Sequence, residues 1–121
     1  MPYAPHVLGQ AGEDAAAAYL LAHDATLALL HRSYRHGRAE IDLIFRRADE
    51  LLLFVEVKTR TGSGHFGAPE TFVSTRKKEL FHQAATHLQE TLDWRGDIRF
   101  DIIALNQRQG GFWVEHFEDA F

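Results

Sequence analysis

Leu51 to Arg60 reads LLLFVEVKTR, and this stretch decides the fold because it is the most apolar part of the chain and yet carries charge at its centre. Its apolar and β-branched residues are typical of a strand. A similar stretch, EIDLIFR, occupies Glu40 to Arg46, and the polar residues 48–50 separate the two. Together they predict a β-hairpin.

Side chains alternate across a strand, so each stretch has two faces. Each has one face of apolar residues only. In the first stretch this face holds Ile41, Leu43 and Phe45, and in the second it holds Leu53, Val55 and Val57. The opposite faces carry the charges. Their members are Glu40, Asp42, Ile44 and Arg46 in the first stretch, and Phe54, Glu56, Lys58 and Arg60 in the second.

A hairpin symmetric about Asp49 pairs Ile44 with Phe54. The same register places Asp42 opposite Glu56 and Glu40 opposite Lys58, with Cβ atoms about 5 Å apart. The faces are better determined than the offset, because a slip of one residue would turn a whole apolar face to water. Three carboxylates and one lysine are therefore expected to converge.

Paired carboxylates repel, and a protein tolerates them where a cation lies between them. Oxygen ligands favour Mg²⁺ or Mn²⁺, which polarise a phosphoryl oxygen and activate a bound water, while a nearby lysine orients that water. The alternative is an exposed ion pair of Glu40 with Lys58, worth about 0.2–1 kcal/mol. Spacing leaves both open, although charge within so apolar a stretch requires a reason.

The remaining elements follow from periodicity and turn residues. We expect helices over about Leu8–His23 and Phe72–Leu92, strands over Thr26–Tyr34 and Ile98–Leu105, and a short strand after Gly110. The order αβββαβ(β) predicts an α/β fold with a mixed sheet.

The composition is that of a single globular domain spanning residues 1–121, with 45% hydrophobic and 25% charged residues. Cysteine is absent, which excludes disulfides and thiolate zinc sites. The eight histidines are scattered, and no pair has the i, i+4 zinc spacing. The N-terminus does not resemble a signal peptide, and no stretch approaches the roughly 18 apolar residues of a membrane helix. We expect a cytoplasmic protein without membrane contact.

The net charge of −4 argues against a general nucleic-acid coat protein, because such proteins neutralise many phosphates. The basic residues nevertheless gather in residues 31–60 and at 76–78. This distribution suits local contact with a phosphate backbone, although a solvated surface of mixed charge explains it equally well. The residues that we expect to contact nucleic acid are Arg38, Arg60 and Lys77.

Asp42 together with Glu56-Val57-Lys58 resembles the PD-(D/E)XK nuclease signature. The wider pattern resembles the YraN family, uncharacterised protein family 0102, from about Gly9 to the end of the chain. That family is described as endonuclease-like and distantly similar to archaeal Holliday-junction resolvases. The motifs that carry the resemblance are Gly12-Glu13, Glu40 to Ile44, Phe54 to Arg60, Phe66-Gly67, Val73 with Lys77, and Arg99 to Asp101.

The resemblance implies a restriction-endonuclease-like core and a Mg²⁺- or Mn²⁺-dependent endonuclease that cuts DNA, in particular branched or single-stranded DNA in recombination or repair. It implies that Asp42, Glu56 and the Val57 carbonyl bind the metal and that Lys58 is the catalytic lysine. It adds Glu13 as a further acid that is both catalytic and metal-binding, with Glu40 as a weaker candidate. The alternative for Glu13 is a carboxylate that stabilises a helix N-terminus by about 0.3–1 kcal/mol.

Two other features have alternative explanations. Residues 62–67 match the dinucleotide fingerprint G-x-G-x-x-G, but the next helix starts too late to meet a pyrophosphate, so a loop beside the active site is favoured. Within that loop, His65 is expected at the surface. Asp101 either supports Lys58 or the metal, or is a core-edge acid paired with an arginine near Arg99.

A second function class stays open, namely a nucleic-acid-binding or adaptor module that is inactive alone or needs a protein partner. The acidic net charge favours it, because it predicts weak DNA affinity for the isolated chain. Junction cleavage needs two symmetric cuts and would therefore imply a homodimer, for which the sequence holds no interface signature.

Overall fold

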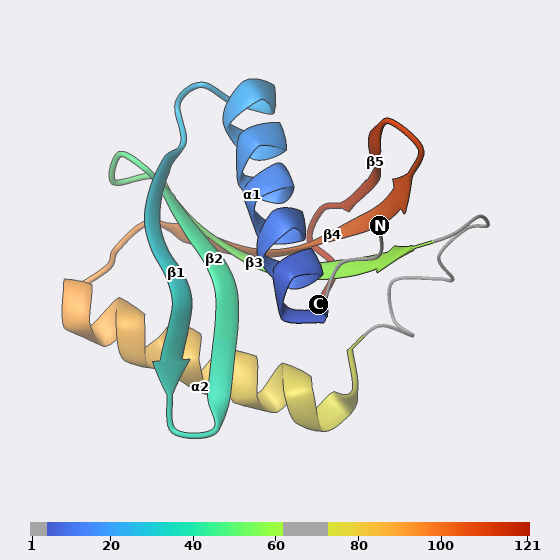
Figure 1. Cartoon of the computed structure of the whole chain (residues 1–121). Coiled ribbons are helices and arrows are strands. Elements are labelled where there is room, and N and C mark those ends of the chain that lie inside the picture. Colours follow the sequence, from blue (N-terminus) through green and yellow to red (C-terminus); the bar gives the residue numbers. More distant parts are fainter. Residues whose placement is uncertain (1–4, 62–72) are drawn as a thin grey trace.

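The computed structural model describes residues 5–61 and 73–121, with side chains from residue 9 onward. These ranges form two helices and five strands (Figure 1). Neither helix combines the length and apolar character that a membrane crossing requires. The elements are α1 (Pro5–His23), β1 (Ala28–His36), β2 (Ala39–Arg47), β3 (Leu51–Thr61), α2 (Thr75–Leu92), β4 (Asp97–Arg108) and β5 (Gly111–Phe117).

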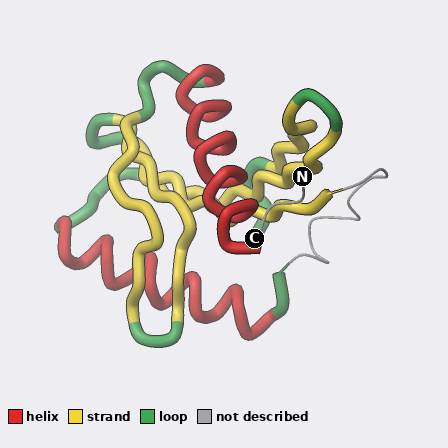
Figure 2. The backbone as a smooth tube through the Cα atoms, viewed as in Figure 1, coloured by secondary structure: helices red, strands yellow, loops and turns green. Residues whose placement is uncertain are grey.

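The five strands form one mixed sheet in the order β1-β2-β3-β4-β5 (Figure 2). β3 and β4 run parallel, and all other neighbours run antiparallel. Parallel neighbours need a crossover connection, and α2 lies in the connection from β3 to β4. The predicted α/β class, with a mixed sheet and this order of elements, is confirmed.

The two helices cover opposite faces of the sheet. Leu20 of α1 packs in one cluster with Val55, whereas Phe81 of α2 packs in another with Phe54. Neighbouring residues of a strand point to opposite faces, so β3 is covered on both sides. The predicted faces of β3 are confirmed, since Leu53, Val55 and Val57 all lie on the α1 side.

β2 departs from the predicted alternation at Asp42. Ile41 packs in the α2 cluster and Leu43 in the α1 cluster, although residues two apart in a regular strand share a face. On the neighbouring strand β1, Ser33 has a φ of 50° and is not paired, although the ladder keeps one register from Arg32–Leu43 to Tyr34–Ile41. The predicted common face of Ile41, Leu43 and Phe45 is therefore wrong at Ile41, because the strands are irregular where Ser33 is left-handed.

The hairpin register is the predicted one as far as the ladder extends, but only one of the three predicted pairs lies within it. Ile44 pairs with Phe54, as expected, and the ladder between β2 and β3 ends at the pair Leu43 and Val55. The next two positions along the hairpin are Asp42 and Glu56, so the strands cease to pair where the predicted site begins.

The predicted starts of β1 and α2 shift by a few residues. β1 begins at Ala28 because Thr26 belongs to a turn, in which its N–H donates to the Asp24 carboxylate over 2.9 Å. α2 begins after Ser74, whose Oγ accepts a hydrogen bond from the Lys77 N–H over 3.1 Å. The predicted start of that helix, at residue 72, lies outside the described residues.

Candidate active site

An open pocket of about 370 Å³ lies where β2 parts from β3, between the sheet and α2. It contains Asp42 and Glu56, the two acids of the predicted motif, and Arg38 and Lys77, two of the predicted nucleic-acid contacts. The lining residues are Arg38, Ala39, Glu40, Asp42, Glu56, Lys77, Leu80 and Phe81.

Asp42 is attached to β3 through its side chain. Its Oδ2 accepts a hydrogen bond from the Val57 N–H over 2.7 Å, at the level where the backbone ladder has ended. Burial, followed by the hydrogen bond and charge of Glu56, raises the pKa of Asp42 to about 8. The carboxyl group therefore holds a proton at neutral pH as long as no cation offsets Glu56.

Glu56 is the most buried acid of the pocket, with 4% of its side chain exposed. Its Oε2 lies 2.5 Å from Lys77 Nζ and 4.0 Å from Lys58 Nζ. Despite this proximity, Oε2 receives no hydrogen bond of acceptable geometry from the described residues. A buried carboxylate oxygen without a hydrogen bond is costly, and metal coordination would satisfy it.

The two lysines beside Glu56 differ electrostatically. Burial lowers the pKa of Lys58, and the positive charge of Lys77 adds to that decrease, while Glu56 opposes it. Burial also acts on Lys77, but its ion pair with Glu56, whose Oε2 lies 2.5 Å away, outweighs burial and raises the pKa of Lys77. Lys77 is thus the main cationic partner of Glu56, and Lys58 is the lysine whose charge is less stabilised.

Gly12 brings α1 close to β3. A Cβ atom at this position would lie 2.1 Å from Thr59 Oγ1, so only glycine allows the helix to approach the strand this closely. The next residue is Glu13, whose pKa is raised by burial and by the charges of Glu40 and Glu56, although Arg32 opposes the shift. The predicted fourth acid therefore belongs to the same electrostatic cluster.

Glu40 does not pair with Lys58 as predicted. Its carboxylate lies 3.2 Å from the guanidinium of Arg35 on β1. The prediction is wrong because it extended the ladder between β2 and β3 beyond Leu43, where the strands separate. Glu40 still lines the pocket, so it remains close to the other acids.

The donor set suits a hard divalent cation in part. Asp42 and Glu56 interact directly and supply carboxylate oxygens, the ligands that Mg²⁺ and Mn²⁺ prefer. Across residues 9–61 and 73–121, no third acid joins these two with oxygens within 4.8 Å of one another. Glu13 and the Val57 carbonyl therefore stay predicted ligands, and waters or substrate would complete the coordination.

Arg60 lies on β3 two residues beyond Lys58 and is half-buried. Arg60 is not among the described residues that line the pocket, whereas Arg38 and Lys77 are. The glycine-rich segment 62–67, with His65, lies outside the described residues, and so does its predicted position beside the site.

Asp101 belongs to a separate ion cluster. It is fully buried and accepts two hydrogen bonds from Arg99, each 2.9 Å long, and one from the Asp119 N–H over 3.0 Å. His116 Nε2 lies 2.7 Å from Asp101 Oδ2. Of the two predicted alternatives, the arginine-paired acid is correct. The sequence does not indicate a contact of His116 with Asp101, because 15 residues separate the two.

Comparison with known proteins identifies relatives over nearly the whole chain. Residues 12–105 match the uncharacterised protein family UPF0102. A UPF0102 protein of Chlorobium limicola is 40% identical and covers 100% of this chain and 96% of its own length. Another, from Lawsonia intracellularis, is 33% identical over 94% of this chain and 84% of its own length.

A more distant likeness exists among solved structures. The Pyrococcus furiosus protein SfsA, solved in complex with Ca²⁺, shares 14% identity at a TM-score of 0.38. The alignment covers 93% of this chain and 63% of SfsA. The relationship by sequence is far stronger, and on that evidence the chain belongs to the uncharacterised protein family UPF0102, the YraN family.

Proposed function

We propose that this protein is a divalent-metal-dependent endonuclease that hydrolyses DNA phosphodiester bonds, with branched or single-stranded DNA as the expected substrate. The supporting observation is that Asp42 and Glu56 share one open pocket with Lys77, while Lys58 approaches Glu56 from the same strand. Two interacting carboxylates, one buried and one partly buried, beside two lysines match the parts that metal-assisted phosphodiester hydrolysis requires.

The acids would hold Mg²⁺ or Mn²⁺. Asp42 and Glu56 supply the first oxygens, and Glu13 and the Val57 carbonyl are the further candidates. When bound, the cation would polarise a phosphoryl oxygen and lower the pKa of a water. The Val57 N–H fixes the orientation of Asp42, and this preorganises one ligand before any metal arrives.

The lysines have different roles in this proposal. Lys58 would orient the attacking water and offset negative charge that develops on the phosphate. Lys77 forms an ion pair with Glu56, so a cation that binds Glu56 would compete with it. Lys77 is half-exposed and can turn toward a phosphate, and Arg38, which also lines the pocket, offers a second positive charge.

The test is cleavage of labelled four-way junctions, single-stranded DNA and plasmid by purified protein with Mn²⁺, with Mg²⁺ or with EDTA. Lys58→Ala and Asp42→Ala should each abolish cutting, and EDTA should do the same. Lys78→Ala and Asp49→Ala are matched controls outside the pocket and should cut normally. Cutting that persists in both pocket variants would refute the assigned mechanism.

A second function is favoured by two observations, the net charge of −4 and the neutralisation of Glu56 by Lys77. Both fit a nucleic-acid-binding or adaptor module that acts through a protein partner. DNA binding without cleavage under any divalent metal, and no heat on Mn²⁺ titration, would support it. A homodimer is the assembly expected for junction cutting, and sedimentation with and without a four-way junction measures it.

A further inference from the structure

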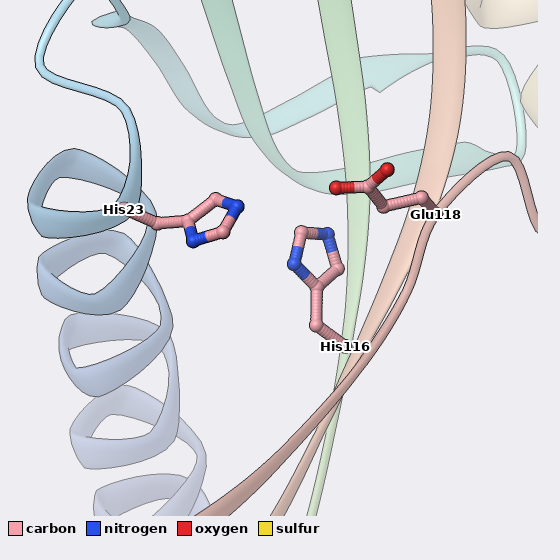
Figure 3. A group of neighbouring side chains, drawn as sticks. All are labelled: His23, His116 and Glu118. Carbon is pink, nitrogen blue, oxygen red and sulfur yellow. The ribbon is translucent and has the colours of Figure 1, made fainter.

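A second group of metal-binding side chains lies away from the acidic pocket. His23 is the last residue of α1, His116 is in β5, and Glu118 follows that strand. One ligand atom from each lies within 4.8 Å of the others, which no other three acids or histidines achieve in the described part of the chain. Figure 3 shows the His116 ring between the His23 ring and the Glu118 carboxylate.

His116 is oriented by a buried acid. Its Nε2 lies 2.7 Å from Asp101 Oδ2, and Asp101 is fully buried. The other donors to Asp101 are the Arg99 guanidinium, which makes two hydrogen bonds, and the Asp119 N–H. Asp101 is therefore an ionised acceptor, so Nε2 carries the proton and donates.

This tautomer leaves the Nδ1 lone pair of a neutral His116 available. Arg99 already balances the charge of Asp101 through two hydrogen bonds. Nδ1 faces His23 in Figure 3, and its nearest described partner is the Tyr19 hydroxyl at 3.3 Å, a long contact. A histidine with one nitrogen bound to a carboxylate and the other held only by a long contact with a hydroxyl resembles the usual arrangement of a metal-binding imidazole.

The other two ligands are partly prearranged and free to adjust. His23 stacks on Tyr19, with ring centroids 5.6 Å apart and planes 12° from parallel. Both His23 and Glu118 are exposed, so rotation of their side chains is not blocked by packing. A tetrahedral zinc ion needs ligand atoms roughly 3.3 Å apart, since Zn–N bonds are about 2.0–2.1 Å long. The three ligand atoms, which lie within 4.8 Å of one another, must therefore move closer together when the ion binds.

We propose that His23, His116 and Glu118 bind one Zn²⁺ ion, with water as the fourth ligand. Two imidazoles and one carboxylate favour zinc over Mg²⁺, which prefers oxygen ligands alone. The ion would join the C-terminal end of α1 to the segment after β5. This site is independent of the proposed nuclease function, because its ligands differ from those of the acidic pocket.

The test is a Zn²⁺ titration of the full chain against a chromogenic chelator. The protein carries Asp42→Asn and Glu56→Gln, so that the acidic pocket cannot contribute. We expect one zinc ion per chain. His23→Gln or Glu118→Gln should each weaken binding by at least about 10-fold, because the loss of a direct ligand should cost no less than the loss of a group that supports a ligand. His31→Gln replaces an exposed histidine on β1 and should bind zinc normally.

X-ray absorption of the loaded protein should show two imidazole ligands, and His23→Gln should reduce them to one. His23 and Glu118 are exposed, so their variants are expected to fold, and circular dichroism checks this. If one variant does not fold, the other decides. Equal zinc affinity of the parent protein and the folded variants, or no zinc bound at all, would overturn the proposal.

Discussion

Asp42 on β2 is a partly buried acid and Asp101 on β4 is a fully buried one, and their environments are opposite. Asp101 accepts hydrogen bonds from Arg99, His116 and the Asp119 N–H, and its pKa is lowered. Asp42 accepts one from the Val57 N–H and lies against Glu56, and its pKa is raised to about 8. The number and charge of the donors, rather than burial alone, separate a structural acid from one that favours a cation.

The largest effect should come from removing the charge of Asp101. Asp101→Asn should lower the free energy of unfolding by about 3–5 kcal/mol, because Arg99 and His116 lose a buried ionised partner. Asp42→Asn should cost far less in the metal-free protein, since Asp42 lies beside a like charge. Urea unfolding at neutral pH measures both. Equal costs would contradict the distinction between the two acids.

The next effect is the pH dependence of stability in EDTA. Unfolded Asp42 loses its proton near pH 4, whereas the folded carboxyl keeps it until about pH 8. Stability from this group is therefore complete at acidic pH and falls as the pH rises toward about 8. Asp101 acts in the opposite sense, because its lowered pKa adds stability that is lost in acid.

Comparison of the parent with Asp42→Asn at several pH values isolates this contribution. The stability difference between the two proteins should change across the range and should level off above pH 8. Parallel pH profiles would show that the pKa of Asp42 is not raised.

Gly12→Ala should affect the acidic pocket more than the Asp101 cluster. The added Cβ would lie 2.1 Å from Thr59 Oγ1 and force α1 away from β3, which costs about 1–3 kcal/mol. Thr59→Ala should recover part of the loss. Gly9→Ala is the matched control, because nothing lies within 4 Å of its Cβ and alanine favours a helix. Equal thermal unfolding temperatures of Gly12→Ala and Gly9→Ala would contradict the close approach of α1 to β3.

The smallest effect concerns Lys77. Lys77→Ala should tighten Mn²⁺ binding roughly fivefold, about 1 kcal/mol, because the lysine no longer competes for Glu56. Lys78→Ala removes the same charge from a residue that does not line the pocket, and this variant should bind Mn²⁺ as the parent does. Isothermal titration calorimetry distinguishes them. Weaker binding in Lys77→Ala would mean that the lysine supports the metal site.

The sequence predicted β3 well because its pattern is regular. Phe54, Glu56 and Lys58 share one face and Val55 lies on the other, and the pairing of Ile44 with Phe54 was also foreseen. Alternation is a local property, so a strand of this length reveals its faces without knowledge of the rest of the chain. The acids of the pocket were found in the same way.

Long-range and irregular features were not predictable from the pattern. Ser33 is left-handed although it is not a glycine, so its residue type does not predict the irregularity beside Asp42. The end of the ladder at Leu43 and Val55, which leaves Glu40 apart from Lys58, also has no sequence signal. His23 and His116 come from α1 and β5, and only the folded sheet brings them together. Lys77 was expected to contact nucleic acid, but its ion pair with Glu56 depends on how α2 packs.

The central claim is that the Asp42 and Glu56 pair binds a divalent cation, and Mn²⁺ calorimetry tests it most directly. The titration is performed at neutral pH in two buffers of different ionisation enthalpy, on protein carrying His23→Gln. We predict one Mn²⁺ per chain with proton release, because the raised pKa keeps Asp42 protonated until the cation arrives. Both should disappear in Asp42→Asn. Unchanged Mn²⁺ binding in that variant, or no binding to the parent, would contradict the account.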